Sequence, residues 1–415
     1  MKFAIIGGGI TGVSVATELY KKNIDFTLFE KEASLGGNAK VYKNLDIAVY
    51  YFIKEKYKNL FDLAEEFDLP FKKKNLSIFY NNKLIIETYS NDFNKLDKIL
   101  KNYKKTLYLS PITIGEFFKL FKFSDEFINN GILLIMNIFC ICCKKEDLFK
   151  MPIQVLYETH SLMPHNNKEI YTWNTNSFDF YSKITEKFKD KIILNSNIIS
   201  IKRSKVNKIK YIYKNTVMES DFTHLLVCCQ LKNVVNIIDN PTKDELYLKR
   251  NIKYIKLNQK IIKNNKKVNN NDCFICNRNS QNYIEISIQY NDYLIKNTLG
   301  RFDTIKDIDE KIVSEYIYEI IYSDKNHLFL NLSILSKING ENNTWWVYDN
   351  IPGQSHEDCY VNGIKTVTNI LNKSKKKLNL STDVLDKIDN QLFVLYKFFN
   401  FIQKLIYYIY KFISF

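Results

Sequence analysis

Glycines near the N-terminus are spaced so that they could hold a phosphate group. Gly7, Gly9 and Gly12 form a G-x-G-x-x-G pattern directly after the apolar run 2–6. In such a turn the first glycine allows a tight bend, the second lets backbone N–H groups approach a pyrophosphate, and the third lets the following helix pack closely. The partial positive charge of a helix N-terminus also favours an anion. The pattern therefore predicts a dinucleotide site.

The elements around these glycines are those that a dinucleotide site requires. The run 2–6 predicts a buried strand, and 13–23 predicts a helix. The apolar side chains expected to share one face of this helix are Val13, Ala16, Leu19 and Tyr20. A second apolar strand ends at Glu30, whose carboxylate can accept hydrogen bonds from a ribose diol. The alternative is an incidental glycine turn in an ordinary α/β unit.

A second pair of glycines bears on which dinucleotide is bound. Gly36 and Gly37 follow closely after Glu30. This pair resembles the extended motif of flavoproteins in the glutathione-reductase-like and amine-oxidase-like groups, where it lets the chain pass close to the pyrophosphate. The resemblance favours FAD. A nicotinamide-dependent enzyme that uses the same strand–helix–strand unit is the alternative.

Several later stretches resemble the FAD-dependent oxidoreductases of the flavin amine oxidase superfamily. The closest likeness is to a bacterial branch often found beside cyclopropane fatty acid synthases. The stretches that carry the resemblance are 35–71, 150–162, 190–204, 221–229 and 338–371. The last of them contains a Gly-x-x-His-Glu-Asp core at Gly353, His356, Glu357 and Asp358. In the family, this segment closes over the flavin.

The resemblance implies an α/β fold in which a Rossmann-like, glutathione-reductase-like FAD domain is interleaved with a mixed α+β substrate domain. The FAD domain is expected to be discontinuous, comprising 1–55, 191–243 and 336–378. The substrate domain is expected to comprise 56–190, which looks mainly helical, and 244–335. Strand-like runs at 254–262 and 283–290 suit a sheet in this domain.

The resemblance also implies a set of cofactor contacts and a reaction. The expected cofactor-binding residues are Gly7, Gly9, Ile10, Thr11, Gly12, Glu30, Lys31, Gly36, Gly37, Asn38, Ile198, Gly353, His356 and Glu357. Hydride transfer from a substrate C–H bond to FAD would then be the chemistry, with an amine or a lipid as substrate. His160 and Tyr348 are weak catalytic candidates. Capping of the helix that follows is the alternative role of His356 and Glu357.

Three departures from the family pattern favour an alternative function. Ala48 replaces a glycine, Tyr348 and Asp349 stand where the family has small residues facing the flavin, and 172–180 has no glycine where the family has a Gly-Gly-Ser turn after a tryptophan. Each adds a side chain where backbone should approach the cofactor. A degenerate, non-catalytic scaffold of the same fold is therefore the second hypothesis.

Composition limits the partners and the compartment. The net charge is +15, but arginine, the residue best suited to phosphate and base recognition, occurs at only four positions. The four are Arg203, Arg250, Arg278 and Arg301. We therefore expect no nucleic-acid partner and assign the charge to a solvated lysine surface.

The cysteines and the C-terminal segment bear on location. Cys273 and Cys276 form a C-x-x-C, but no second such pair or paired histidine follows at zinc spacing, so no metal site is expected. The cysteines suit a reducing, cytoplasmic compartment. We expect a helical amphipathic tail over 382–415. Its lysine stripe and aromatic flanks at 392–415 suit peripheral membrane contact or docking on protein.

Overall fold

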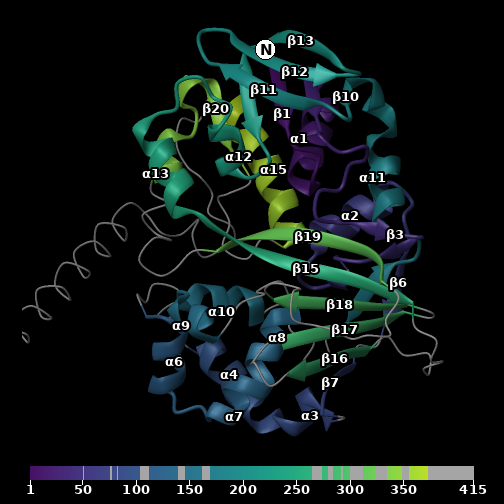
Figure 1. The fold of residues 1–415 in the computed structure, drawn as a ribbon, viewed down its shortest axis with the longest axis vertical. Coiled ribbons are helices and arrows are strands. Elements are labelled where there is room, and N and C mark those ends of the chain that lie inside the picture. The colour runs from purple at the N-terminus through teal and green to yellow at the C-terminus, as the bar shows by residue number, and fades with distance from the viewer. Residues whose placement is uncertain are drawn as a thin grey trace, which may run out of the picture.

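The computed structural model of the chain consists of two halves, one above the other in the view of Figure 1. The residues that the structure describes are 1–49, 51–74, 77–81, 83–102, 112–138, 145–160, 169–263, 273–278, 284–290, 293–299, 312–322, 334–347 and 355–372. Tyr348, Gly353 and the predicted tail 382–415 lie outside these residues.

A five-stranded parallel sheet forms the centre of the upper half (Figure 1). Its strands, in spatial order, are β10 (Ile192–Ile193), β2 (Asp25–Phe29), β1 (Lys2–Ile6), β14 (His224–Val227) and β20 (Thr344–Trp346). These strands come from three parts of the sequence, near its beginning, middle and end. The predicted α/β fold with a Rossmann-like sheet is therefore confirmed.

Helix α1 (Ile10–Lys21) follows β1 and is buried on almost all sides. Val13, Ala16 and Leu19 are buried as expected, but Tyr20 is 39% exposed, so its assignment to the apolar face is wrong. Helix α15 (His356–Leu371) packs against α1, so α1 is covered by other elements as well as by its own sheet. A local sequence pattern cannot reveal this second cover, which comes from the far end of the chain.

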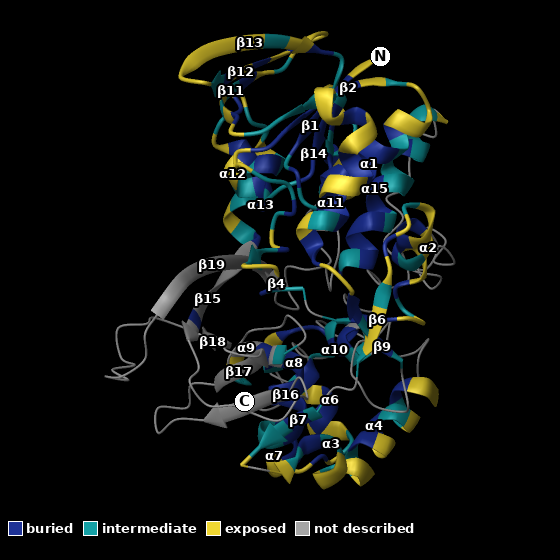
Figure 2. Ribbon diagram, turned by 90° about the vertical axis from the view of Figure 1, so that its right-hand side faces the viewer, coloured by how far each residue is buried: buried dark blue, intermediate teal, exposed yellow. Residues whose placement is uncertain are grey.

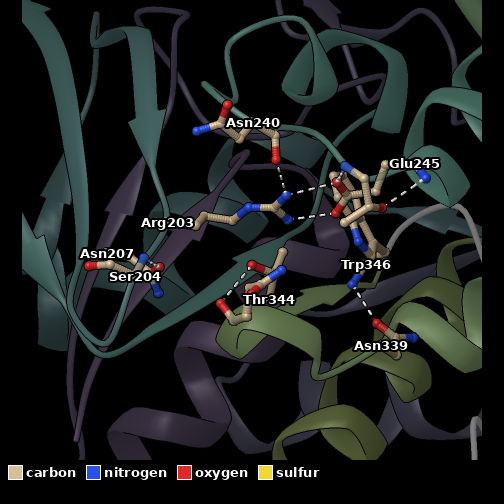
Figure 3. A network of polar contacts seen from close by, with 10 residues as sticks. Arg203, Ser204, Asn207, Asn240, Glu245, Asn339, Thr344 and Trp346 are labelled. Atoms are coloured by element: carbon tan, nitrogen blue, oxygen red, sulfur yellow. Dashed lines mark hydrogen bonds and ion pairs between the residues drawn. The ribbon is translucent and has the colours of Figure 1, made fainter.

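A three-stranded antiparallel sheet lies beside the parallel one, at the top of Figure 1. Its strands are β11 (Asn197–Lys202), β12 (Asn207–Tyr213) and β13 (Thr216–Phe222). It shares an apolar cluster with the short helices α12 (Leu231–Val235) and α13 (Lys243–Asn251). Arg203, just after β11, forms a buried ion pair with Glu245 of α13, and this pair fixes the sheet to the helix (Figure 3).

A seven-stranded sheet forms part of the lower half. Its strands, in spatial order, are β19 (Ile312–Tyr322), β15 (Lys253–Lys263), β18 (Tyr293–Leu299), β17 (Ile284–Tyr290), β16 (Cys273–Arg278), β7 (Ser77–Tyr80) and β8 (Lys83–Leu84). Strands β15 and β17 confirm the predicted strands at 254–262 and 283–290.

Helices fill the rest of the lower half and pack around one apolar core. They are α3 (Ile85–Thr88), α4 (Ser90–Asn102), α6 (Ile114–Leu120), α7 (Asp125–Phe127), the π-helical turn Ile128–Ile132, α8 (Leu133–Ile138), α9 (Lys145–Lys150) and α10 (Ile153–His160). The described residues of 56–190 are mainly helical, as predicted. Within the described residues, no helix is both long enough and apolar enough to cross a bilayer.

Shorter elements complete the described part of the structure. They are β3 (Val41–Tyr42), β4 (Leu45–Asp46), β5 (Phe52–Ile53), α2 (Lys58–Glu66), β6 (Phe71–Lys74), β9 (Ile170–Trp173), α11 (Ser177–Thr185), the 3₁₀ turn Glu186–Lys191 and a second 3₁₀ turn, Glu341–Asn343. One apolar cluster contains side chains from α1, α2, β5, β9, α11 and α15. Figure 2 shows α2 with both buried and exposed parts, whereas the residues of β6 are half-buried or exposed. The domain boundaries given above stay a prediction.

Candidate functional site

The two glycine groups predicted from the sequence lie in contact. Gly36 N–H donates a hydrogen bond to Gly8 O over 2.9 Å. A Cβ atom on Gly37 would lie 3.1 Å from the Cα of Gly9. The chain therefore passes from β2 back across the turn between β1 and α1, and both glycine groups border one place in the structure.

Gly9 is the glycine that the fold itself does not require. Gly7 has a φ of +104°, and a Cβ on Gly12 would lie 1.9 Å from Gly7 O, so the chain needs glycine at both positions. Gly9 has a φ of −72°. Among the described atoms, a Cβ there would meet only Gly37 Cα, at an ordinary 3.8 Å. The open space beside Gly9 fits the close approach of a ligand.

The N-terminus of α1 offers backbone donors at this place. Its N-cap is Gly9, which has no side chain to accept a hydrogen bond, and its first turn carries no acidic residue. The first backbone N–H groups of a helix have no partner within the helix. Ile10 and Thr11 have buried side chains, so their contribution would come from their backbone N–H groups. These uncapped amides fit an anionic group such as a pyrophosphate.

Glu30 lies where β2 ends, directly beside the glycine turn. Its carboxylate accepts hydrogen bonds from Gly8 N at 2.6 Å and from Glu32 N at 2.9 Å, and the residue is 6% exposed. Ser196 binds the backbone carbonyl of Glu30. Each carboxylate oxygen has a second lone pair, so Glu30 can still accept a hydroxyl group. This placement fits the predicted contact with a ribose.

The other predicted contacts near the turn lie at its edges. Lys31 is exposed, with its Nζ 3.6 Å from Glu32 Oε1. Asn38 is exposed in the turn after the second glycine pair. Ile198 is part of β11, half-buried and opposite Tyr211, in the segment that follows the Glu30 contact. Each of these three residues thus follows closely in sequence on a residue of the site or on Ser196, which binds Glu30.

His356 lies at the first position of α15 and faces α11. Its Nε2 atom is 3.0 Å from Tyr181 Oη. Burial lowers the pKa of His356 to about 4, so the imidazole is neutral at physiological pH. Burial, with Cys359 and Asp46 nearby, raises the pKa of Tyr181. A Cβ on Gly36 would lie 3.5 Å from the Tyr181 ring, so this neutral pair borders the second glycine group.

Glu357 binds helix α2. Its two oxygens accept hydrogen bonds from Asn59 and Leu60, and burial raises its pKa. The helix α15 is itself capped by Ser355, whose Oγ accepts a hydrogen bond from Asp358 N. The alternative role of helix capping therefore applies to Glu357, but on a different helix from the expected one.

Of the two catalytic candidates, His160 lies away from the glycine turn, and Tyr348 lies outside the described residues. His160 ends α10 in the lower half, and its Nε2 is 2.5 Å from Asp97 Oδ1 of α4. Tyr348, like the predicted cofactor contact Gly353, lies outside the described residues. The catalytic role of His160 stays a prediction.

Sequence reasoning missed two residues beside the site. Tyr181 lies in a stretch without a recognisable motif. Asp46 is 6% exposed and accepts a hydrogen bond from Ser177 N at 2.8 Å. Burial raises the pKa of Asp46 to about 6, against the opposing effect of the hydrogen bonds from Ser177. The sequence signal that could have identified Asp46 is its position as the one acidic residue in the otherwise apolar stretch 45–49.

Comparisons with known proteins agree with the upper half of the fold. A family profile described as an NAD(P)-binding Rossmann-like domain matches residues 5–67. This range contains the glycine turn, Glu30 and the second glycine pair. No curated protein sequence matches the chain.

Solved structures extend the likeness to most of the chain. A CLA-producing fatty acid isomerase from P. acnes is 11% identical, with a TM-score of 0.65 over 88% of this chain and 98% of that one. A putrescine oxidase redesigned in its cofactor binding is 11% identical, with a TM-score of 0.66 over 90% and 99%. Cyclohexylamine oxidase from Brevibacterium oxydans is 10% identical, with a TM-score of 0.66 over 90% and 99%.

These likenesses define the class of fold. The chain has the mixed α/β architecture of these amine oxidases and of the isomerase, with a Rossmann-like dinucleotide-binding unit at its N-terminus. At such low identity, the resemblance concerns the fold alone. The assignment of a reaction has to come from the site.

Proposed function

We propose that this protein is an FAD-dependent oxidoreductase of the amine-oxidase-like kind. The contact between the two glycine groups, beside Glu30 and the uncapped start of α1, carries the proposal. The space left open at Gly9 supports a ligand there, because the fold alone does not explain that glycine. The amine oxidases of similar fold support a flavin rather than a nicotinamide cofactor.

The described residues have distinct roles in this proposal. The backbone N–H groups at the start of α1 would bind the pyrophosphate, and Glu30 would bind the adenosine ribose. Gly8 and Glu30 are buried, and Gly7 and Gly9 are half-buried, so the site partly excludes water, which would strengthen these hydrogen bonds. FAD, when bound, supplies the group that accepts a hydride from a substrate C–H bond. We assign no acid or base to this step.

We infer an amine or a lipid as substrate. Solved structures of similar fold include two amine oxidases and a fatty acid isomerase. The sequence likeness to the branch beside cyclopropane fatty acid synthases favours the lipid.

A visible absorption spectrum of freshly purified protein tests the cofactor. Bound FAD gives a band at about 450 nm, whereas a nicotinamide cofactor gives none there. A yellow protein that releases FAD on denaturation supports the proposal. Colourless protein that takes up no FAD when FAD is added in excess contradicts it.

Gly9→Ala is expected to weaken FAD binding about tenfold without unfolding the protein. The methyl group fits the ligand-free turn at 3.8 Å from Gly37 Cα, but it enters the space assigned to the pyrophosphate. The measurement is the FAD dissociation constant from quenching of flavin fluorescence, together with the thermal midpoint of the ligand-free protein. Lys22→Ala, at the opposite end of the same helix, is the control and should bind FAD as the wild type does.

A non-catalytic flavin-binding scaffold is the second candidate. Ala48, in place of the family's glycine, lies in the described part of the chain and is half-buried. Its side chain, with those of Tyr348 and Asp349, would restrict the flavin. Photoreduction of the purified protein separates the two functions. A bound flavin that light with an electron donor cannot reduce, and that no amine or lipid bleaches, would favour the scaffold.

A further inference from the structure

Three consecutive residues at the start of α15 contact two other segments, helix α11 and the start of α2. His356 contacts Tyr181 of α11, as described above. Asp358 Oδ1 lies 3.6 Å from the Nζ of Lys56, just before α2. Glu357, between them, binds the first turn of α2. The first turn of α15 is therefore held by both α11 and the start of α2.

The contacts of Glu357 use both of its carboxylate oxygens. Oε1 accepts hydrogen bonds from the backbone and side-chain nitrogens of Asn59, at 2.9 and 2.6 Å. Oε2 accepts a hydrogen bond from Leu60 N at 2.9 Å. Tyr57, the N-cap of α2, provides no capping side chain within the described structure. A carboxylate from 297 residues further along the chain thus caps α2.

Helix α15 is fixed to α1 on another side. A Cβ on Gly363 would lie 1.9 Å from Ser14 Oγ and 2.9 Å from Thr11 O, so the two helices touch closely there. Cys359, one turn before Gly363, also receives a hydrogen-bonding contact from Thr11. Thr11 belongs to the first turn of α1, which offers the donors for the dinucleotide. A shift at the start of α15 would therefore reach this turn.

We propose that Glu357 is a positioning residue for the dinucleotide site. Its three hydrogen bonds to α2 hold the first turn of α15, and α15 in turn holds the N-terminal turn of α1 in the conformation that binds the pyrophosphate. The identity of the ligand rests on the proposed function, whereas the positioning of the first turn of α1 depends on contacts within the chain alone. Glu357 need not touch the cofactor for this role.

Glu357→Gln is the substitution that isolates these contacts. Glutamine keeps the side-chain volume and can still accept a hydrogen bond through its oxygen, but its NH₂ group cannot accept one from Leu60 N. Glu116→Gln is the matched control. Glu116 Oε2 accepts a hydrogen bond from Thr113 N at 2.6 Å, which caps α6 in the lower half of the molecule.

The test combines hydrogen exchange of the ligand-free, full-length protein with FAD titration. In Glu357→Gln we expect faster exchange of the backbone amides of 58–62 and also of 7–12. A role limited to capping α2 would leave the exchange of 7–12 unchanged. We expect FAD binding to weaken about tenfold, which corresponds to about 1.4 kcal/mol. Glu116→Gln should match the wild type in both measurements.

Other outcomes separate the positioning role from the cofactor assignment. Faster exchange confined to 58–62, with exchange at 7–12 as in the wild type, would overturn the positioning role. If the wild type binds no FAD, the proposed function fails, and exchange at 7–12 still decides the positioning. Should Glu357→Gln not fold, Asn59→Ala removes only the 2.6 Å bond and should give the same pattern with smaller changes.

Discussion

Replacement of Arg203 by methionine is expected to lower the free energy of unfolding by about 3–5 kcal/mol. The Arg203 guanidinium donates to both oxygens of Glu245, at 2.6 and 2.8 Å, and the two side chains are 5% and 3% exposed (Figure 3). Removing the arginine leaves a buried carboxylate without its counter-charge. The cost of that uncompensated charge exceeds the net stabilisation that the intact pair provides.

The position of the pair explains why its loss should affect the whole upper half. Arg203 also donates to Asn240 O at 3.2 Å, and Glu245 closes a capping box with Thr242 at the start of α13. The pair therefore links the end of β11 to α13. Trp346 of β20 is buried in the same apolar cluster and contributes, with Trp173 and Trp345, to the fluorescence that follows unfolding.

Urea unfolding of three variants tests this prediction. Lys208→Met is the control, since its pairing with Glu219 at 3.3 Å is exposed and should contribute less than about 1 kcal/mol. The double variant Arg203→Met with Glu245→Gln removes the leftover charge and should recover part of the loss. A loss for Arg203→Met no larger than that for Lys208→Met would show that the buried pair does not stabilise the fold as described.

The strand–turn–helix–strand unit at the N-terminus could be predicted because its information is local. An apolar run, three glycines at fixed spacing, a helix and Glu30 all lie within thirty residues of one another, and each restricts the backbone directly. The outlines of later strands and helices followed from apolar periodicity and from resemblance. The nearness of the two glycine groups followed from the resemblance of the second pair to a flavoprotein motif, in which both groups border one diphosphate.

The polar contacts around the site could not be predicted in the same way. His356 and Tyr181 are 175 residues apart, and Asp46 and Ser177 are 131 apart. A charged or polar residue carries no periodic pattern that identifies its partner, and the chain has 60 basic and 45 acidic residues to choose from. The capping of α2 by Glu357 required knowledge of which helices pack together.

Asp46→Asn is expected to change the free energy of unfolding in a pH-dependent way. Its effect should be more stabilising at neutral pH than at about pH 4, by about 3 kcal/mol. Burial raises the pKa of the Asp46 carboxyl from 3.8 to about 6. Above the folded pKa, the wild type keeps an ionised carboxylate in a buried place. Asparagine can accept the hydrogen bond from Ser177 N without carrying that charge.

The sign of the effect follows from proton binding in the two states. Between about pH 4 and 6, unfolded Asp46 has lost its proton while folded Asp46 keeps it, so the stability from this group falls as pH rises. His356 acts in the opposite direction, because burial lowers its pKa from 6.5 to about 4. Over the same window its unfolded form is protonated and its folded form is not, so its contribution rises with pH.

These two contributions oppose each other in the wild type, so a variant is needed to separate them. Urea unfolding of the wild type and of Asp46→Asn from about pH 4 to about pH 7.5 gives the difference directly. Asp221→Asn, at an exposed site, is the control and should show no such trend. If the difference between Asp46→Asn and the wild type is the same at every pH, Asp46 is not held protonated by the fold.

His356→Gln should show the opposite trend in the same urea measurements. Relative to the wild type, this variant should be most stable at the acidic end, because the buried imidazole of the wild type resists protonation there.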